Sequence, residues 1–265
     1  MKNISVIVGV YNEEKRIERF LKSFGVFDEI IVNDKSSTDN TAAICLKYGA
    51  KVNNLPYSDR GDLGKDAVKV ARNEWVLIVT ASDVIHPDLP KILIDLINAD
   101  NFSAEVVYVP YIVHVHGINS KYVIGDTSYR PWLCKKNVLV FQDIVHEENS
   151  FNTKNVFYLP KNRKVAIHHL SHQNMESTFE RYLRYSKLEI KKNRSLYSWL
   201  RYIIRAFATG IRKRFWKLGW DGLALLLMLI LYRIMIFLWA WEKKRGIDVE
   251  AYYDEFAKKL YDQST

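Results

Sequence analysis

The sequence predicts an α/β fold, with a Rossmann-like, mainly parallel sheet and flanking helices, followed by a helical C-terminal region. Two observations lead to this class. In the first 115 residues, short apolar runs alternate with segments of helical periodicity, and such an alternation is typical of βαβ units. From Met175 onward, every segment has helical spacing. We therefore expect two domains, 1–172 and 173–265.

Each predicted element follows from the pattern of its apolar residues. Ile4 to Val10 is a continuous apolar run, which favours a strand buried on both faces. In the next segment, Ile17, Phe20, Leu21 and Phe24 fall on one face of a helix. The same patterns predict strands at 4–10, 28–32, 50–53, 75–80 and 104–115, then short strands and loops from 120 to 170. They predict helices at 13–24, 41–48, 62–72, 87–97, 175–193, 197–217, 221–242 and 248–262.

The composition excludes several classes of protein. The chain has 265 residues, of which 48% are hydrophobic and 26% are charged, as in a folded globular protein rather than a disordered one. Its two cysteines, Cys45 and Cys134, are too few for a disulfide scaffold or a Cys-based zinc finger. The first apolar stretch is short and is soon followed by Glu13 and Glu14, unlike a signal peptide. We therefore expect the active part in the cytoplasm.

The net charge of +9 is concentrated in the C-terminal half. Residues 1–130 carry 15 basic and 17 acidic side chains, and the remainder carries 24 and 13. Twelve basic residues lie between Arg181 and Lys217, with Glu189 as the one acid among them. A basic run of this kind indicates nucleic acid, an anionic membrane or a solvated helix face.

The segment after the basic run favours a membrane surface. Gly222 to Trp241 contains twenty residues and one charge, Arg233, and a helix of that length spans about 30 Å, the thickness of a bilayer core. Tryptophans at both ends and basic residues on both flanks are typical of a membrane interface. We predict membrane association, with a spanning and an interfacial helix both open. The alternative is a buried core helix or a dimer interface, so a homo-oligomer also stays open.

Polar side chains follow three of the predicted strands. They belong to Val10–Glu14, Val32–Thr41 and Val79–Asp83. In open parallel sheets, ligands bind beyond the carboxyl ends of the strands. We therefore expect the binding site at this edge of the sheet.

At these residues the chain resembles the family 2 glycosyltransferases of the GT-A fold. Val10–Glu14 and Asp34–Thr41 look like that family's T-Y-N-E-E and D-x-x-S-T-D-x-T segments. The likeness continues at Trp75–Leu77, Val145–Glu147 and Ile167–His169 and into the helical tail, so it covers most of the chain. Within the family, the chain most resembles bacterial enzymes that add β-linked glucose or a similar sugar to lipopolysaccharide core or related surface glycans.

The resemblance implies a nucleotide-sugar donor, expected to be UDP-linked. A base and a ribose need a carboxylate acceptor and a closely approaching backbone, which Asp34 and the turn after the first strand supply. The predicted donor-binding residues are Val10, Tyr11, Asn12, Glu13, Asp34, Lys65, Ser82, Asp83 and Arg130. Helix capping is the alternative role for Asp34 and Glu13, and it is the preferred role for Ser37, Thr38 and Asp39.

The resemblance also implies a divalent cation, Mg²⁺ or Mn²⁺, held by an Asp-x-Asp segment after the fourth strand. Such a cation neutralises the leaving diphosphate. Here Thr80 and Ser82 occupy the two Asp positions, and Asp83 follows one step later. Asp83 and His168 are the predicted metal ligands: either Asp83 alone supplies the carboxylate of the site, or the site is weakened or absent. If it is absent, Lys65 or Arg130 would stabilise the leaving charge.

An inverting transfer needs one general base to deprotonate the acceptor hydroxyl. The resemblance places that base at the His-Glu pair, so Glu147 is the predicted base and His146 its positioning neighbour. Asp143 and Glu148 are the local competitors, and a set of solvated loop acids is the alternative reading of all four.

These observations predict a membrane-associated, inverting glycosyltransferase at the cytoplasmic face, with a lipid-attached or surface glycan as acceptor. The alternative is a degenerate relative that binds a nucleotide or a partner without transfer, because the Asp-x-Asp segment is missing. A nucleic-acid binder would explain the basic run but neither the balanced first half nor the apolar segment, so we expect no nucleic acid. A nucleotidyltransferase is disfavoured because no Gly-rich phosphate loop follows the first strand.

Overall fold

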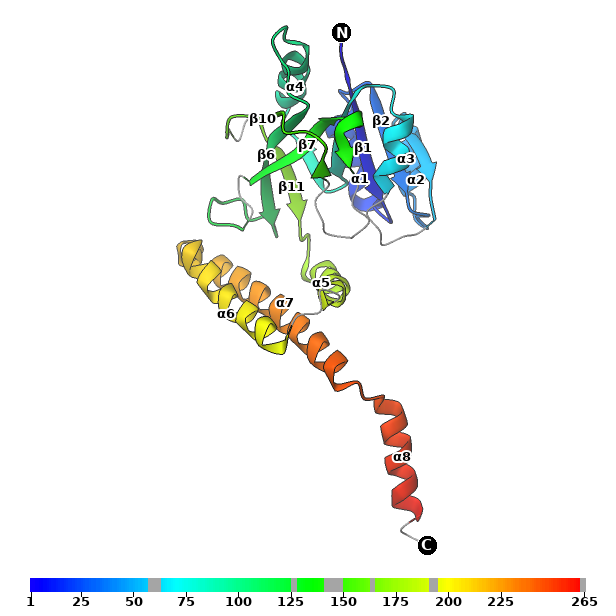
Figure 1. The fold of residues 1–265 in the computed structure, drawn as a ribbon, viewed down its shortest axis with the longest axis vertical. Coiled ribbons are helices and arrows are strands. Elements are labelled where there is room, and N and C mark those ends of the chain that lie inside the picture. The colour runs from blue at the N-terminus through cyan, green and yellow to red at the C-terminus, as the bar shows by residue number, and fades with distance from the viewer. Residues whose placement is uncertain (57–62, 125–127, 141–149, 163–164, 191–194, 263–265) are drawn as a thin grey trace. The chain divides into compact units, whose positions relative to one another are not determined.

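The computed structural model describes residues 1–56, 63–124, 128–140, 150–162, 165–190 and 195–262 (Figure 1). The chain divides into two compact units, Met1–Ser171 and His172–Thr265. The first unit is an α/β domain and the second is helical, as the sequence predicts.

The first unit is built on a sheet whose nine strands lie in the described part of the chain. In spatial order they are β3 (Lys51–Asn54), β2 (Glu29–Asp34), β1 (Ile4–Val10), β4 (Trp75–Thr80), β7 (Ser128–Lys135), β6 (Val106–Val115), β11 (Ile167–Ser171) and β5 (Asp83–Ile85), with β10 (Val156–Tyr158) also beside β6. Strand β7 runs antiparallel to β4 and β6, β5 runs antiparallel to β11, and the other pairings are parallel. A small antiparallel pair, β8 (Leu139–Val140) and β9 (Ser150–Phe151), stands apart.

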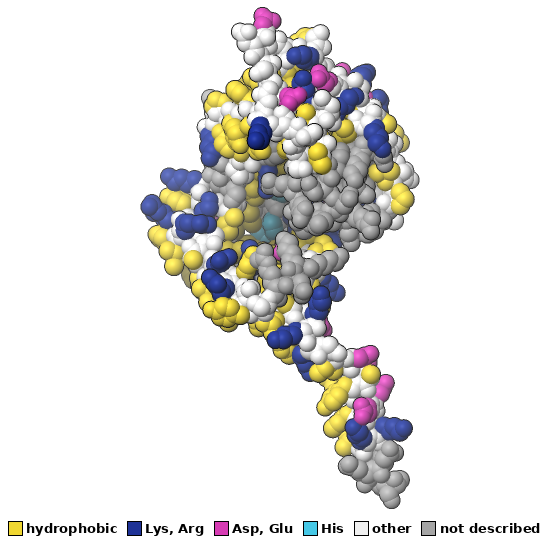
Figure 2. Space-filling model, in the orientation of Figure 1, with side chains coloured by type: hydrophobic (Ala, Val, Ile, Leu, Met, Phe, Trp, Pro, Cys, Tyr) yellow, Lys and Arg dark blue, Asp and Glu magenta, His cyan; other side chains and the backbone are white. Residues whose placement is uncertain are grey.

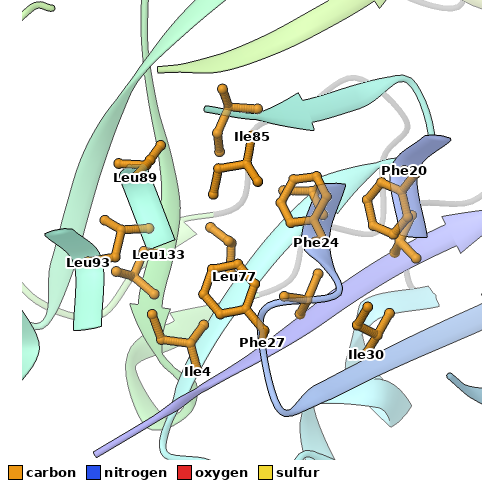
Figure 3. Packing of buried hydrophobic residues seen from close by; sticks show 14 of the residues in the cluster. Ile4, Phe20, Phe24, Phe27, Ile30, Leu77, Ile85, Leu89, Leu93 and Leu133 are labelled. Atoms are coloured by element: carbon orange, nitrogen blue, oxygen red, sulfur yellow. The ribbon is translucent and has the colours of Figure 1, made fainter. Parts of the chain in front are cut away.

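Helices cover both faces of this sheet because the buried strands are apolar on both sides. Val6 and Val8 of β1 point into the larger core cluster, whereas Ile7 between them belongs to the smaller cluster on the opposite face. Helices α1 (Glu14–Phe24), α2 (Thr41–Lys47) and α4 (Leu89–Asn98) contribute to the larger cluster, and α3 (Leu63–Val70) contributes to the smaller one. Figure 3 shows Phe24 of α1 beside Ile85 and Leu77 of the strands, with Phe20 next to Phe24 and with Leu89 and Leu93 of α4 beyond the strand residues. The one-sided apolar spacing read from the sequence of α1 is therefore its packing face.

The spatial order of the strands changes direction at β1: β2 and β3 follow on one side of it, whereas β4 lies on the other side. The register pairs Val10 with Asp34 on one side and Gly9 with Thr80 on the other. The polar ends of these three strands consequently lie side by side at the carboxyl edge of the sheet. Ligands of open α/β sheets bind at such a switch point.

The second unit contains α5 (Met175–Glu189), α6 (Leu196–Arg212), a short 3₁₀ turn at Phe215–Leu218, α7 (Trp220–Arg245) and α8 (Val249–Asp262). Helix α5 is tied to α7 by a hydrogen bond from Trp239 Nε1 to Ser186 Oγ of 3.1 Å. Helix α7 has 26 residues and contains an 18-residue window with a mean hydropathy of 2.4, so its length and composition suffice to cross a membrane. The four helices predicted for this region are all present.

Candidate active site

The turns after β1 and β2 are joined by backbone and side-chain hydrogen bonds. Lys35 N–H donates to Val10 O at 3.0 Å. Asn12 N–H donates to Ser37 Oγ at 2.9 Å, and Thr38 N–H donates to Asn12 Oδ1 at 2.8 Å. Asn12 adopts a φ of 53°, a left-handed conformation that asparagine tolerates better than most residues. The sequence therefore uses an Asn at this position both to turn the chain and to hold the two turns together.

Asp34 ends β2 beside Val10 and is 3% exposed. Its Oδ1 accepts hydrogen bonds from Ser37 N–H at 3.1 Å and from the Ser37 hydroxyl. Among the described residues, these are the hydrogen bonds that the carboxylate accepts, and Oδ1 accepts both of them. Oδ2 is consequently left to accept a hydrogen bond from a ligand. The turn role and the ligand role proposed for Asp34 thus fall on different oxygens.

Of the three residues expected to cap helices, Asp39 does so, whereas Ser37 and Thr38 do not. Asp39 accepts from Glu14 N–H at 3.1 Å and from Thr41 N–H at 3.0 Å, at the first turns of α1 and α2. Burial acts to raise the pKa of Asp39, but a hydrogen bond from the Thr41 hydroxyl and these two from N–H groups lower it below its usual value. Ser37 and Thr38 bind Asn12 instead of capping a helix.

The capping role expected for Glu13 is also absent. Glu13 stands at the N-cap of α1, but its side chain does not cap the helix. The carboxylate forms an ion pair with Arg16, while the backbone carbonyl accepts from the N–H groups of Arg16 and Ile17, both at 2.9 Å. Tyr11, by contrast, is 39% exposed at the strand end, where an aromatic ring is accessible to a ligand.

Asp83 lies in β5 and is surrounded by protein hydrogen-bond donors. Its Oδ2 accepts from Thr80 N–H at 2.8 Å, and its Oδ1 accepts from Tyr111 Oη at 3.0 Å. His169 Nδ1 lies 2.8 Å from the same Oδ1, and the Asp83 side chain is fully buried. Burial, followed by the nearby Asp83 carboxylate, raises the pKa of the Tyr111 hydroxyl. Asp83 is therefore the centre of an internal hydrogen-bond cluster.

Arg130 of β7 reaches the same cluster. Its guanidinium lies 5.7 Å from the centre of the Tyr111 ring, and the Trp132 ring lies 5.7 Å from that ring as well. Thr80 Oγ1 is buried without a partner among the described residues. The structure thus brings Arg130 and Asp83 together around Tyr111, as two of the predicted donor-binding residues. Ser82, a third, is buried between Thr80 and Asp83.

His168 occupies a different face of the sheet from the Asp83 cluster. Strand β11 pairs His169 with Asp83, so the adjacent side chain of His168 points to the opposite face. There, His168 Nδ1 lies 3.0 Å from His114 Nε2. The prediction that Asp83 and His168 share one cation is therefore corrected by the register of two strands.

The described residues do not fit a divalent-cation site. Among them, no group of three or more His, Cys, Asp and Glu side chains could hold a metal ion. The single carboxylate at the fourth strand end, Asp83, already accepts three internal hydrogen bonds. We therefore derive no step of the reaction through a metal held by these residues.

Three predicted residues cannot be placed in this site. Glu147 and His146, with their competitors Asp143 and Glu148, lie outside the described residues. The backbone of Lys65 belongs to α3, while its side chain is outside the described part. Sequence reasoning missed Tyr111 and His169 as partners of Asp83. Their signal was a Tyr and a His inside otherwise apolar strands, but only the register shows which carboxylate they meet.

The strand order and the polar edge define an α/β protein with a candidate ligand site at the switch point of a largely parallel sheet. The family model described as Glycosyl transferase family 2 matches residues 5–171, which contain all of this sheet except Ile4. The chain belongs to glycosyl transferase family 2.

Several relatives and solved structures resemble parts of the chain. An uncharacterized glycosyltransferase of Rickettsia typhi is 37% identical over 90 residues, which cover 34% of this chain and 31% of that protein. The poly(ribitol-phosphate) beta-N-acetylglucosaminyltransferase TarS of Staphylococcus aureus is 37% identical over 103 residues, covering 34% of this chain and 18% of that protein. The chain thus spans less than a third of the length of these curated relatives.

A solved structure supports the fold. The crystal structure of S. aureus TarS 1–349 in complex with UDP-GlcNAc matches with a TM-score of 0.53 and 23% identity, over 72% of this chain and 66% of that one. At this identity the likeness extends to the fold alone.

Proposed function

We propose that the chain transfers a sugar from a nucleotide-sugar donor, UDP-linked, to a lipid-attached or surface glycan, with inversion at the anomeric carbon. The observation that carries this proposal is the polar edge at β1 and β2. There, Asp34 keeps one carboxylate oxygen for a ligand, and Tyr11 is exposed beside it. The similarity to a structure solved with UDP-GlcNAc supports the choice of donor.

In this proposal the residues have separate roles. Asp34 accepts a hydrogen bond from the base or ribose, and the backbone from Val10 to Asn12 lies against the nucleotide. Glu147 removes the proton from the acceptor hydroxyl as that oxygen attacks, and His146 orients Glu147. Arg130 supplies positive charge to the leaving diphosphate. Asp83, through its hydrogen bonds, fixes the strand ends on which this site is built.

A second function is favoured by one observation. Thr80 and Ser82 replace two acidic positions of the family, and Asp83 is fully engaged inside the protein. A chain that binds a nucleotide or a partner without transfer would have the same features. Turnover, rather than binding, distinguishes the two functions.

The test uses the purified full chain and a panel of UDP-sugars and GDP-sugars. Release of UDP or GDP is measured with Mg²⁺, with Mn²⁺ and with EDTA, and nucleotide binding is measured separately by calorimetry. Transfer predicts nucleotide release from one donor, and release that persists in EDTA assigns the leaving charge to Arg130 or Lys65. Binding without release from any donor would support the second function and overturn the first.

Two variants locate the site, and one serves as control. Asp34→Asn should weaken UDP binding roughly 10- to 100-fold, as expected for losing a hydrogen bond to a charged group. Asp28→Asn is the matched control, because Asp28 precedes the same strand at its opposite end and pairs with Arg72. Glu147→Gln should abolish release while leaving UDP binding intact. Equal affinity of Asp34→Asn and the wild type for UDP would refute the assigned nucleotide site.

The helical unit belongs to the same proposal. We assign it to attachment at the cytoplasmic face of a membrane, where a lipid-linked acceptor lies. Its support is the length and hydropathy of α7 together with the basic residues at its C-terminal end, Lys243, Lys244 and Arg245. Cations beside an apolar helix are attracted to anionic lipid headgroups.

A further inference from the structure

Helix α6 exposes an apolar row on a face separate from its packing face. Large apolar side chains recur every three or four residues and are 46–70% exposed: Tyr197, Leu200, Ile204, Phe207 and Ile211. The buried residues of the same helix are Trp199, Ala206 and Gly210. At 100° per residue, the centres of the two sets lie about 120° apart around the helix, so they occupy separate faces. We call the five exposed residues the α6 row.

Exposed arginines line one edge of the α6 row. Arg201, Arg205 and Arg212 are all exposed, and on the helix they lie roughly 60–100° from Ile204. Just beyond the helix, Trp216 and Trp220 are 61% and 85% exposed. Figure 2 shows Lys and Arg side chains interspersed with hydrophobic ones over this part of the surface. An apolar face bordered by cations, with tryptophans nearby, is typical of helices that lie in a membrane interface.

The packing of α6 on α7 fixes the depth at which these arginines would lie. The two helices run antiparallel, because Gly210 of α6 approaches Leu226 while Tyr202 meets Arg233. A Cβ at Gly210 would lie 2.8 Å from Leu226 Cδ1, and the Arg233 guanidinium lies 5.0 Å from the Tyr202 ring centre. Arg201 and Arg205 are therefore level with Arg233, in the middle of the apolar stretch of α7.

This geometry disfavours a spanning α7. If α7 crossed a bilayer with α6 packed along it, Arg201, Arg205 and Arg233 would all lie near the midplane of the membrane. Arginines at that depth are strongly unfavourable for insertion. With both helices parallel to the membrane plane, the arginines of α6 lie at the level of the lipid phosphates instead.

We propose that α6 and α7 lie together in the plane of an anionic lipid bilayer, with the α6 row inserted among the acyl chains. This inference rests on the proposed membrane attachment of the helical unit, and it is independent of the transfer reaction. The three arginines beside the α6 row favour an anionic lipid surface as its partner, because their positive charges complement anionic headgroups. In a self-associating interface the same arginines would face like charges on a second copy.

The first experiment measures binding of the full chain to vesicles by flotation. Vesicles of phosphatidylcholine with phosphatidylglycerol are compared with vesicles of phosphatidylcholine alone. The double variant Ile204→Asp/Phe207→Asp should lower the partition coefficient at least tenfold, since both side chains are exposed and carry little of the fold. Leu46→Asp is the matched control, because Leu46 of α2 is as exposed as Ile204, at 62%. Arg201→Gln/Arg205→Gln should lower binding roughly tenfold or more on the anionic vesicles only.

The outcomes distinguish a lipid bilayer from a second copy of the chain as the partner of the α6 row. Unchanged binding in the Ile204→Asp/Phe207→Asp variant would overturn the assignment of the α6 row to lipid. If instead that variant bound vesicles normally but lost mass in light scattering, the row would contact a second copy. Nucleotide release on soluble substrates, measured in parallel, should be the same in all these variants. The membrane inference therefore fails independently of the transferase proposal.

A second experiment distinguishes an in-plane α7 from a spanning one. Single cysteines are introduced at exposed positions near its two ends, Asp221→Cys and Ile247→Cys. Sealed membrane vesicles from expressing cells are then treated with a membrane-impermeant maleimide before and after permeabilisation. An in-plane helix predicts that both cysteines label from the same side. Labelling of one end only after permeabilisation would show a spanning helix and refute the proposal.

Discussion

Replacement of Asp83 tests whether its carboxylate is a structural hydrogen-bond acceptor or a metal ligand. The side chain is fully buried, and it accepts hydrogen bonds from Thr80 N–H, the Tyr111 hydroxyl and His169 Nδ1 at 2.8, 3.0 and 2.8 Å. Asp83→Ala leaves these three groups without their acceptor, at a cost of about 1–3 kcal/mol each. We expect a loss of at least about 3 kcal/mol, which lowers the Tm of a domain of this size by about 6–12 °C. Asp83→Asn keeps the shape and one acceptor oxygen, so its loss should be smaller.

The assay is thermal unfolding of the first unit within the full chain, followed by intrinsic fluorescence with and without Mg²⁺ or Mn²⁺. Ser82→Ala is the adjacent control, because its hydroxyl forms no hydrogen bond to the described residues, and its Tm should change little. A cation should leave the Tm of the wild type unaltered. The reasoning is refuted if the cation raises the Tm of the wild type but not that of Asp83→Asn. It is also refuted if, without a cation, Asp83→Asn has the same Tm as the wild type.

Three further predictions concern pH, thiol reactivity and helix packing. Burial acts to raise the pKa of Glu29, but hydrogen bonds from Lys51, Ser5 and Arg72 N–H lower it overall. Because the folded pKa lies below the unfolded one, this stabilisation is present above about pH 4.5 and is lost as pH falls through the folded pKa. Glu29→Gln should therefore be less stable at neutral pH and lose less stability on acidification, in urea unfolding at several pH values; parallel curves would contradict this. Burial raises the pKa of Cys134 to about 12 and that of Cys45, with help from Asp34, to about 11. Neither thiol should react with a maleimide at pH 7 until the chain unfolds, and rapid labelling of the native protein would show that the sites open. A Cβ at Gly222 would lie 1.8 Å from the Phe215 carbonyl oxygen, whereas one at Gly210 meets only side-chain atoms. Gly222→Ala should therefore expose the α6–α7 pair to proteolysis far more than Gly210→Ala, and equal resistance would argue against a close approach of Gly222 to the 3₁₀ turn between these helices.

The elements that the sequence predicts well are those specified by local patterns. The continuous apolar run of β1 and the one-sided spacing of Ile17, Phe20 and Phe24 in α1 are visible within a dozen residues. The same holds for the polar ends of β1 and β2, since a parallel sheet brings the carboxyl ends of neighbouring strands together. Asp34 could be assigned to the site for that reason alone.

The environment of Asp83 could not be predicted in this way, because it depends on contacts between distant segments. Its partners Tyr111 and His169 are 28 and 86 residues away. The sequence indicates that His168 and His169 point to opposite faces of a strand, but it does not indicate which of them faces β5. A shift of one residue in the β5–β11 register would exchange the two. The choice of His168 over His169 was therefore beyond the reach of local patterns.

The two ends of the binding edge differ in what remains for a ligand. At β2, Asp34 uses one oxygen for its turn and keeps the other, so a nucleotide can add a hydrogen bond without breaking one. Next to β4, each oxygen of Asp83 already accepts from the protein, so a cation there would have to displace at least one buried donor. The cost of leaving such a donor unpaired opposes that exchange. Positive charge for a diphosphate is therefore better supplied by a group that does not require Asp83 to move. Arg130, beside the Tyr111 ring, is such a group among the described residues.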